Sequence, residues 1–230
     1  MESIGIIIPA FNEEEAIKNV IDDIPKENVQ EIVVVNNNSS DRTEEIAKSA
    51  GVTVLKETKR GYGNACLAGI AHFRNKSSNE QPGIIVFLDA DYSDHPEEMT
   101  QLVNPILEGE YDLVIGSRVL GNREKGAMLP QAILGNMIAT FLIRLIYNFR
   151  FTDLGPFRAI RFNKLLELDM QDRTFGWTVE MQVKALKHGM ECREVPVSYR
   201  KRIGVSKITG TIEGTIKAGY KIIWTIFKYM

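Results

Sequence analysis

The first 120 residues alternate between short apolar runs and longer stretches with helical spacing. The runs have the length of buried strands, and the stretches between them carry helix signals, such as the acids that follow the first run and Pro96 near the start of a later helix. This alternation predicts an α/β fold with a doubly wound, mostly parallel, Rossmann-like sheet, whose ligands gather at the carboxyl ends of the strands. The five predicted strands lie in IGIIIP, EIVVVNNN, VTVLKE, GIIVFLDAD and YDLVIGSR.

The alternation stops after residue 120. From there we expect, in order, an apolar helix at about 130–149, the turn TDLGPFR, a helix near 177–188, the strand ECREVPVSY, a basic loop and a final helix from about 211. No linker or repeat divides the chain. The sequence therefore predicts a single domain over residues 1–230, with a nucleotide-binding half at 1–120 and an acceptor half with a C-terminal amphipathic helix at 121–230.

Charge and cysteine content narrow the class of partner. The net charge of -2 disfavours a nucleic-acid partner, but from Arg200 onward seven Lys and Arg face one acid, which indicates an anionic partner. The two cysteines have no zinc or disulfide spacing. No export signal is evident, and the longest uncharged run, Ala127–Ile143, falls short of the ~20 apolar residues of a membrane span. We expect a cytoplasmic protein.

Two aspartates end the fourth predicted strand, in FLDAD. Side chains alternate along a strand, so Asp89 and Asp91 project to the same side while Ala90 leaves the backbone between them accessible. Paired carboxylates suit Mg²⁺ or Mn²⁺, which complete their shell with water and substrate phosphates. The alternative is that the pair only makes a turn or caps the next helix.

Six segments in order carry a family resemblance: IIIPAFNEEE, VVVNNNSSDRT, KRGYGNACLAG, FLDAD, VIGSR and VSYRKRIGVSK. Together they resemble the family-two glycosyltransferases of the GT-A fold, and most closely the short relatives of dolichyl-phosphate mannose synthase and other polyprenyl-phosphate sugar synthases. The resemblance covers nearly the whole chain. It implies transfer of a sugar from a nucleotide-diphosphate sugar, with either UDP or GDP as the nucleotide.

The resemblance also implies roles for individual residues. The metal ligands would be Asp89 and Asp91, and the catalytic residues Asp91 and Asp153, the latter from TDLGPFR. The nucleotide sugar would contact Pro9, Phe11, Glu13, Asn37, Arg60, Gly61, Asp89, Ala90 and Asp91. Phosphate or acceptor would contact Arg118, Arg202, Ser206 and Lys207. The chain departs from the family where Asn36 and Asn37 replace two aspartates and where Pro156 replaces a glycine.

The nature of the acceptor stays open at this point. A polyprenyl phosphate is already anionic and needs positioning by Arg and Lys, and the final helix has the apolar and basic mix of a peripheral segment on the inner face of a membrane. A sugar hydroxyl would need a general base, for which Asp153 is the first candidate and Glu180 the second, unless Glu180 only belongs to a solvated helix face. A nucleotide-sugar-binding protein without turnover is a further alternative for the function. A homo-oligomer is a separate open question.

Overall fold

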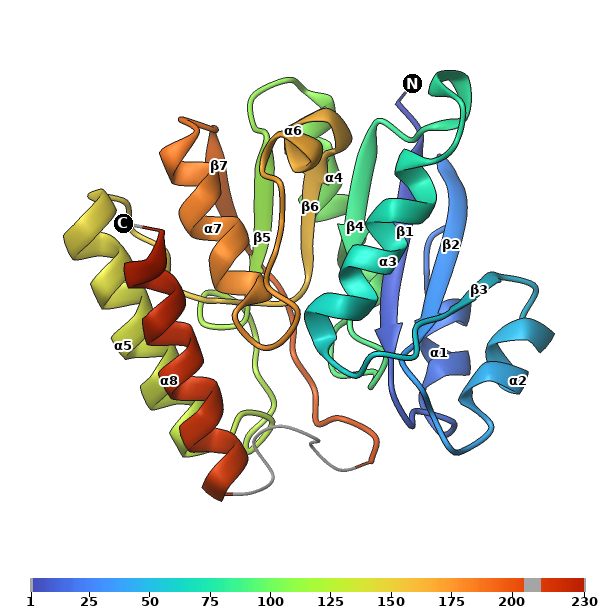
Figure 1. The fold of residues 1–230 in the computed structure, drawn as a ribbon, viewed down its shortest axis with the longest axis horizontal. Coiled ribbons are helices and arrows are strands. Elements are labelled where there is room, and N and C mark those ends of the chain that lie inside the picture. Colours follow the sequence, from blue (N-terminus) through green and yellow to red (C-terminus); the bar gives the residue numbers. More distant parts are fainter. Residues whose placement is uncertain (1, 205–211, 230) are drawn as a thin grey trace.

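A seven-stranded sheet forms the centre of the molecule (Figure 1). The computed structural model describes residues 2–204 and 212–229, without the side chains of 212–218. The strand order is β3-β2-β1-β4-β6-β5-β7, and β6 alone runs antiparallel to its neighbours. The predicted doubly wound, mostly parallel sheet is therefore confirmed. The strands are β1 Ile4–Ala10, β2 Val29–Asn36, β3 Thr53–Lys56, β4 Ile84–Phe87, β5 Leu113–Ser117, β6 Arg158–Arg161 and β7 Cys192–Pro196.

Helices cover both faces of the sheet. Apolar side chains of α1, α2 and α4 pack on one face, and those of α3, α6 and α7 pack on the other. Because both faces are covered, every residue of β1 and β4 is buried, which explains their uninterrupted apolar sequence. The helices are α1 Ile17–Asp22, α2 Thr43–Ser49, α3 Tyr62–Arg74, α4 Met99–Leu107, α5 Pro130–Tyr147, α6 Phe162–Glu167, α7 Trp177–Lys187 and α8 Ile212–Lys228, with 3-10 turns at Ser78–Glu80 and Pro96–Glu98.

Sequence analysis missed two elements, the strand β6 and the helix α6. Residues 152–158 were predicted as a turn, but β6 begins at Arg158 and continues directly into α6. The four residues of β6, RAIR, begin and end with arginine, so they show neither an apolar run nor an alternating pattern. Their strand conformation comes from pairing with β4 and β5 on either side. The predicted helices α5, α7 and α8 are present close to their expected bounds.

The last elements form a layer at one end of the sheet. Helices α5 and α8 lie side by side beyond α7 (Figure 1). Both start at the lower edge in that view, which is also where β1 ends. The polar segments that follow β1, β2, β4 and β5 gather at this same edge. The carboxyl ends of the parallel strands and the first turns of α5 and α8 therefore lie on one side of the molecule.

Candidate active site

Asp89 and Asp91 follow β4 at the carboxyl edge of the sheet, with the buried Ala90 between them. The Oδ1 atom of Asp89 is buried and has no hydrogen-bond partner among the residues that the structure describes. Burial and the neighbouring charge of Asp91 raise the pKa of Asp89 to about 6. Asp91 accepts a 2.9 Å hydrogen bond from the Ser93 N–H, and its Oδ2 lies 2.9 Å from the Arg202 guanidinium. The Asp91 carboxylate is thus paired with Arg202, whereas the Asp89 carboxylate has no such ion pair among the described residues.

The basic segment around Arg202 runs over the aspartates. The Ile203 N–H donates to the Asp91 carbonyl oxygen at 3.0 Å, and the Arg200 N–H donates to the Ser93 carbonyl oxygen at 2.9 Å. These backbone bonds bring Arg202, a predicted phosphate ligand, to the edge of the sheet that holds the aspartates. Ser206 and Lys207, the other two ligands predicted in this loop, lie outside the described residues.

A third acid, Asp94, joins this cluster and was missed by sequence analysis. Its side chain is only 1% exposed, and neither carboxylate oxygen has a hydrogen-bond partner within residues 2–204 and 212–229. Burial and the charges of Asp89 and Asp91 raise its pKa well above the usual range, while Arg118 opposes the shift. The signal in the sequence was the further aspartate in DADYSD, three residues after the pair.

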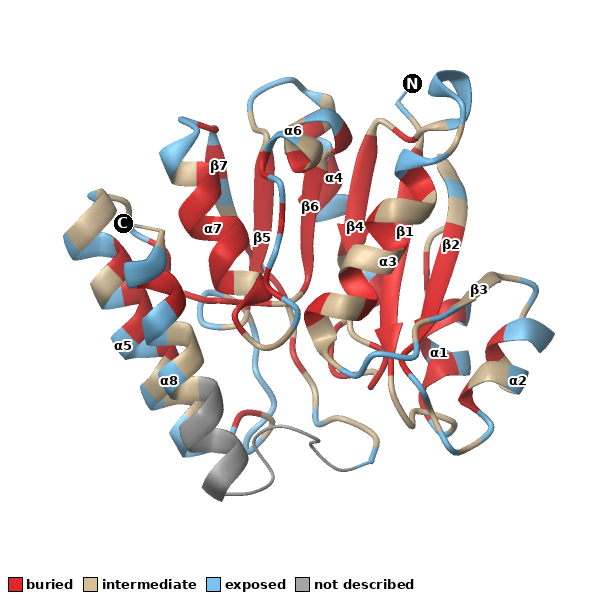
Figure 2. Cartoon of the chain, viewed as in Figure 1, coloured by how far each residue is buried: buried red, intermediate tan, exposed pale blue. Residues whose placement is uncertain are grey.

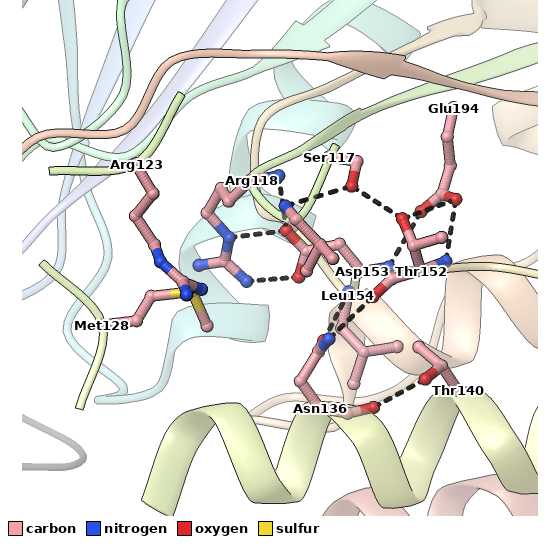
Figure 3. Close-up of polar contacts among 12 residues, drawn as sticks. Ser117, Arg118, Arg123, Met128, Asn136, Thr140, Thr152, Asp153, Leu154 and Glu194 are labelled. Atoms are coloured by element: carbon pink, nitrogen blue, oxygen red, sulfur yellow. Dashed lines mark hydrogen bonds and ion pairs between the residues drawn. The ribbon is translucent and has the colours of Figure 1, made fainter. Parts of the chain in front are cut away.

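Asp153 makes a complete ion pair with Arg118 (Figure 3). Its Oδ2 accepts hydrogen bonds from the Arg118 backbone N–H at 2.8 Å and from Nε at 2.7 Å, and its Oδ1 accepts from Nη2 at 2.7 Å. The Asp153 side chain is fully buried. Burial alone lowers the pKa of Arg118, but the charge and hydrogen bonds of Asp153 outweigh it and raise that pKa. The other face of the guanidinium lies 5.1 Å from the Tyr199 ring centre.

The turn that carries Asp153 is fixed by two side chains from distant elements. Glu194, on β7, accepts hydrogen bonds from the backbone N–H groups of Thr152 and Asp153 at 2.7 and 2.9 Å. Asn136, on α5, donates to the Thr152 carbonyl oxygen at 2.8 Å and accepts from the Leu154 N–H at 2.9 Å (Figure 3). Helix α5 is thereby connected directly to the site.

A buried arginine also forms hydrogen bonds within the turn that carries Asp153. Arg158 is fully buried and donates to the carbonyl oxygens of Gly155 and Thr178, at 3.1 and 2.8 Å. Burial lowers its pKa to about 10. Gln182 adds a 3.0 Å hydrogen bond to the Asp153 carbonyl oxygen. The position of the Arg118–Asp153 pair is therefore set by four elements of the fold, β7, α5, β6 and α7, and the turn sequence contains only the first residue of β6.

The two asparagines at the end of β2 bind the backbone of the protein. Asn37 is buried, accepts a 2.8 Å hydrogen bond from the Gly61 N–H, and donates to the carbonyl oxygens of Glu57 and Lys59 at 3.1 and 2.8 Å. Asn36 donates at 2.7 Å to a glutamate of α2. A carboxylate cannot donate these bonds, so the amides that replace the family's aspartates have a structural reason. Asn37 positions the glycine loop that was predicted to bind the nucleotide.

The glycines of that loop are required by a close backbone contact. A Cβ at Gly61 would lie 2.2 Å from the Arg173 carbonyl oxygen, and one at Gly63 would lie 2.0 Å from the Asp172 carbonyl oxygen. Gly61 also has a φ of 140°, in the region that favours glycine. The loop then enters α3 at Tyr62, which is near Asp89 and whose pKa is raised by burial and by that charge. Tyr62 is a second site residue that sequence analysis missed.

The remaining predicted nucleotide ligands line the end of β1. Pro9 is buried within the strand, and Phe11 follows it with the Arg60 guanidinium 4.5 Å above its ring centre. Glu13 and residues 203–204 border a hollow of about 190 Å³. This edge of the sheet therefore offers an aromatic ring, a guanidinium and a pocket beside the aspartate cluster.

Glu180 has a structural role that the sequence did not indicate. It is fully buried, so the expectation of a solvated helix face is wrong. Its carboxylate accepts hydrogen bonds from the Gln171 N–H at 2.9 Å and from the Tyr229 hydroxyl at 2.8 Å, and it pairs with Lys184 at 2.7 Å. With these partners Glu180 joins α7, the preceding loop and the end of α8.

The aspartate cluster fits a divalent cation held by two carboxylates. Asp89 keeps a buried oxygen without a partner, and Asp91 lies beside it with one oxygen held only by the partly exposed Arg202. No group of three or more His, Cys, Asp or Glu side chains is arranged to enclose an ion in the described part of the chain. Such a site suits Mg²⁺ or Mn²⁺, because these ions take one or two protein carboxylates and complete their shell from water and phosphate.

Comparison with known proteins agrees with this arrangement. Residues 5–168 match the sequence profile of Glycosyl transferase family 2. The chain belongs to this family. It is a glycosyltransferase, and the resemblance predicted from the six segments is confirmed. An uncharacterized protein of Methanocaldococcus jannaschii is 33% identical over 218 residues, which cover 91% of this chain and 88% of that protein.

Two other matches are informative for this family-two enzyme. A dolichyl-phosphate hexose transferase of Haloferax volcanii is 29% identical over 213 residues, covering 90% of this chain and 87% of the relative. Crystal structures of glucosyl-3-phosphoglycerate synthase from Mycobacterium tuberculosis share the GT-A fold. The complex with Mn²⁺, UDP and glucosyl-3-phosphoglycerate superimposes with a TM-score of 0.75 at 22% identity, covering 99% of this chain and 80% of that one.

Proposed function

We propose that this glycosyltransferase moves a sugar from a nucleotide-diphosphate sugar to a polyprenyl phosphate with inversion at the anomeric carbon. One observation carries the choice of acceptor: both carboxylate oxygens of Asp153 are bound by Arg118. The first candidate for a general base is therefore occupied, and the turn presents a guanidinium in its place. A guanidinium suits an acceptor that is already an anion and needs only to be positioned.

The donor would bind along the edge formed by β1, β2 and β4. Phe11, Glu13, Asn37, Arg60 and Gly61 would surround the nucleotide, close to Pro9 and Ala90. Asp89 and Asp91 would hold Mg²⁺ or Mn²⁺, which when bound neutralises charge on the diphosphate leaving group. Glucosyl-3-phosphoglycerate synthase, with the same fold, has been crystallised with UDP and either Mn²⁺ or Mg²⁺, which supports a uridine nucleotide and this choice of metal.

The acceptor would lie between Arg118 and Arg202, and Ser206 and Lys207 stay predicted phosphate ligands outside the described residues. An oxygen of its phosphate attacks the anomeric carbon, the bond from that carbon to the diphosphate oxygen breaks, and the electron pair leaves with the nucleoside diphosphate. No proton has to be removed from the attacking phosphate oxygen. Two relatives support the lipid class: the hexose transferase described above, and a UDP-N-acetylglucosamine–dolichyl-phosphate N-acetylglucosaminyltransferase of Methanococcus voltae.

The test is a matched pair of acceptors. The full chain is incubated with Mn²⁺ and a panel of UDP- and GDP-sugars, together with either a polyprenyl phosphate or the corresponding polyprenol. We expect lipid-linked sugar with the phosphate and none with the alcohol, and loss of product when EDTA is added. Product with the alcohol, or with glycan hydroxyls only, would contradict the proposal.

A hydroxyl acceptor is the second candidate, because the buried carboxylate of Asp94 could serve it as a general base. The carboxylate of Asp94 is buried in the cluster with no hydrogen-bond partner in the described part of the chain, so it is not held in an ion pair as Asp153 is. For a hydroxyl acceptor, loss of a general base at this position would lower kcat by about 10²–10⁴-fold. Asp94→Asn, assayed with phosphate and hydroxyl acceptors, therefore separates the two candidates.

A further inference from the structure

Residues 171–174, which we call the support segment, lie against the glycine loop that was predicted to bind the nucleotide. The segment is found between α7 and the first turn of α3 (Figure 1). Gly61 and Gly63 approach its backbone so closely that a Cβ at either position would collide with a carbonyl oxygen of the segment. The Asn64 N–H also donates to the Arg173 carbonyl oxygen at 3.1 Å. The position of the glycine loop therefore depends on the position of the support segment.

Two buried carboxylates hold the support segment, whose four residues belong to no helix or strand. Glu180 accepts hydrogen bonds from the N–H groups of Gln171 and Asp172 at 2.9 and 2.6 Å, and the Asp172 carboxylate accepts from the Thr174 N–H at 2.8 Å. Figure 2 shows α7, which carries Glu180, in the buried colour along most of its length. Asp172 is only 7% exposed. Buried carboxylates of this kind require partners that neutralise them.

Helix α8 supplies a partner to each carboxylate. The Lys221 Nζ atom lies 2.8 Å from Asp172 Oδ2, and the Tyr229 hydroxyl donates to Glu180 at 2.8 Å. Thr225 is buried between these two positions of α8. The three α8 residues are spaced by four, so they lie on one side of the helix. This polar stripe connects the end of the chain to the support segment.

The two carboxylates depend on α8 to different degrees. Glu180 has a second cation, since Lys184 of the same helix lies 2.7 Å away. Among the residues that the structure describes, Lys221 is the only cation paired with Asp172. Without Lys221, the Asp172 carboxylate would be buried and unpaired, a state that movement of the support segment toward water would relieve. Because Gly61 packs on this segment, the glycine loop would move with it.

We propose that Lys221 is a positioning residue for the nucleotide. Through its ion pair with Asp172, it holds the support segment against the glycine loop, and α8 thereby sets the affinity for the donor. The inference rests on the nucleotide site of the proposed function and deepens it by assigning part of the donor affinity to a side chain that pairs elsewhere. Coupling between two sites is reciprocal, so nucleotide binding should also strengthen the contact between α8 and the support segment.

Calorimetric titration of the full chain tests the inference without any acceptor. The probe is UDP or GDP, whichever binds the wild type more tightly, in the presence of Mn²⁺. Lys221→Met should weaken nucleotide binding by about tenfold, within the usual range of coupling between sites. Lys221→Arg keeps the charge that faces Asp172 and should recover most of the affinity. Equal affinity of the wild type and Lys221→Met would overturn the inference.

Lys164→Met is the matched control. The Lys164 side chain is 32% exposed, close to the 36% of Lys221, and it pairs with Glu167 at 3.1 Å on α6. This pair does not involve the support segment, so the control should bind the nucleotide like the wild type. Urea unfolding is measured on both variants, because a general loss of stability lowers the unfolding midpoint without changing the affinity of the folded protein. An equal loss of affinity in the control would overturn the inference.

A double-mutant cycle separates positioning from direct attraction of the nucleotide. In Asp172→Asn there is no buried charge for Lys221 to neutralise, while the amide oxygen can still accept from the Thr174 N–H. Adding Lys221→Met to this variant should therefore change nucleotide affinity by less than about twofold. A further tenfold loss in the double variant would show that Lys221 attracts the nucleotide itself, which would overturn the inference.

Hydrogen exchange measures the reciprocal effect. Nucleotide and Mn²⁺ should slow amide exchange in the support segment and in residues 219–229 of the wild type, and should slow it less in Lys221→Met. Exchange in residues 219–229 that does not respond to bound nucleotide would contradict the coupling. A wild type that binds neither nucleotide would overturn the proposed function together with this inference. Nucleotide binding that depends on Lys221 supports the inference even if no sugar reaches polyprenyl phosphate, and in that case the acceptor assignment alone fails.

Discussion

Two acidic regions at the same edge of the sheet are built in opposite ways. Asp89 and Asp94, after β4, have buried carboxylate oxygens with no partner in the part of the chain that the structure describes. Asp153, before β6, has both oxygens bound by Arg118. An unpartnered buried carboxylate is unfavourable, whereas a bidentate pair is satisfied within the protein. The carboxylates of the first region therefore suit a cation, whereas the carboxylate of the second region is already satisfied by Arg118.

The largest effect should come from removing a charge in the first region. Asp91→Asn and Asp89→Asn should each lower transfer by at least about 10³-fold, because the cation and the diphosphate lose a ligand together. Asp89→Asn should leave the thermal unfolding temperature of the metal-free protein unchanged or higher, because it relieves repulsion between buried carboxylates. Activity and thermal unfolding are measured on the same samples. Full activity in Asp89→Asn, or in EDTA-treated wild type, would contradict the assignment.

The corresponding aspartate-to-asparagine substitution in the second region should lower the stability of the fold. Asp153→Asn leaves the mostly buried Arg118 without its counter-charge and should lower the free energy of unfolding by about 3 kcal/mol. Urea unfolding measures this change. In a double-mutant cycle, Arg118→Met combined with Asp153→Asn should cost less than the sum of the two single changes. Additive effects would show that the pair does not stabilise the fold.

A smaller effect is expected at the glycine loop. Asn37→Asp places a carboxylate against the carbonyl oxygens of Glu57 and Lys59 and should cost about 2 kcal/mol of stability, with weaker UDP binding. Asn38→Asp is the matched control, since it makes the same charge change at an exposed neighbour. Urea unfolding and calorimetric titration with UDP give the two quantities. Equal behaviour of the two variants would mean that the Asn37 amide does not hold the loop.

The smallest effect should appear in the acceptor KM. Arg202→Ala removes a charge-assisted contact and should raise the KM for polyprenyl phosphate by about tenfold. Lys201→Ala, the exposed neighbour that pairs with Glu124, should leave this KM nearly unchanged. Steady-state kinetics with the best donor measures both values. A KM that rises equally in the two variants would indicate a general effect of basic charge and no specific phosphate contact.

The sequence predicts the sheet well because the parallel strands β1, β4 and β5 are fully buried and therefore mostly apolar, as is the second half of β2. It fails at β6, whose arginines give no strand pattern and whose conformation depends on its neighbours β4 and β5. It also predicts the carboxylates Asp89, Asp91 and Asp153 from short segments. What it cannot predict is their partners.

The partners come from long-range contacts that only the folded chain creates. Arg118 and Asp153 are 35 residues apart and meet next to the paired strands β5 and β6. The amide bonds of Asn37 likewise depend on the loop before α3. In the same way, the apolar residues of α5 were visible in the sequence, but their exposure follows from Asn136, which turns the polar side of that helix inward.

Calorimetric titration with Mn²⁺ in the presence of UDP tests the contrast between the two acidic regions most directly. We predict that the wild type and a folded Asp153→Asn variant bind Mn²⁺ with similar affinity, and that Asp89→Asn shows no binding in the same range. Mn²⁺ affinity that is retained in Asp89→Asn and lost in Asp153→Asn would contradict the account, because the cation would then depend on the carboxylate that Arg118 already neutralises.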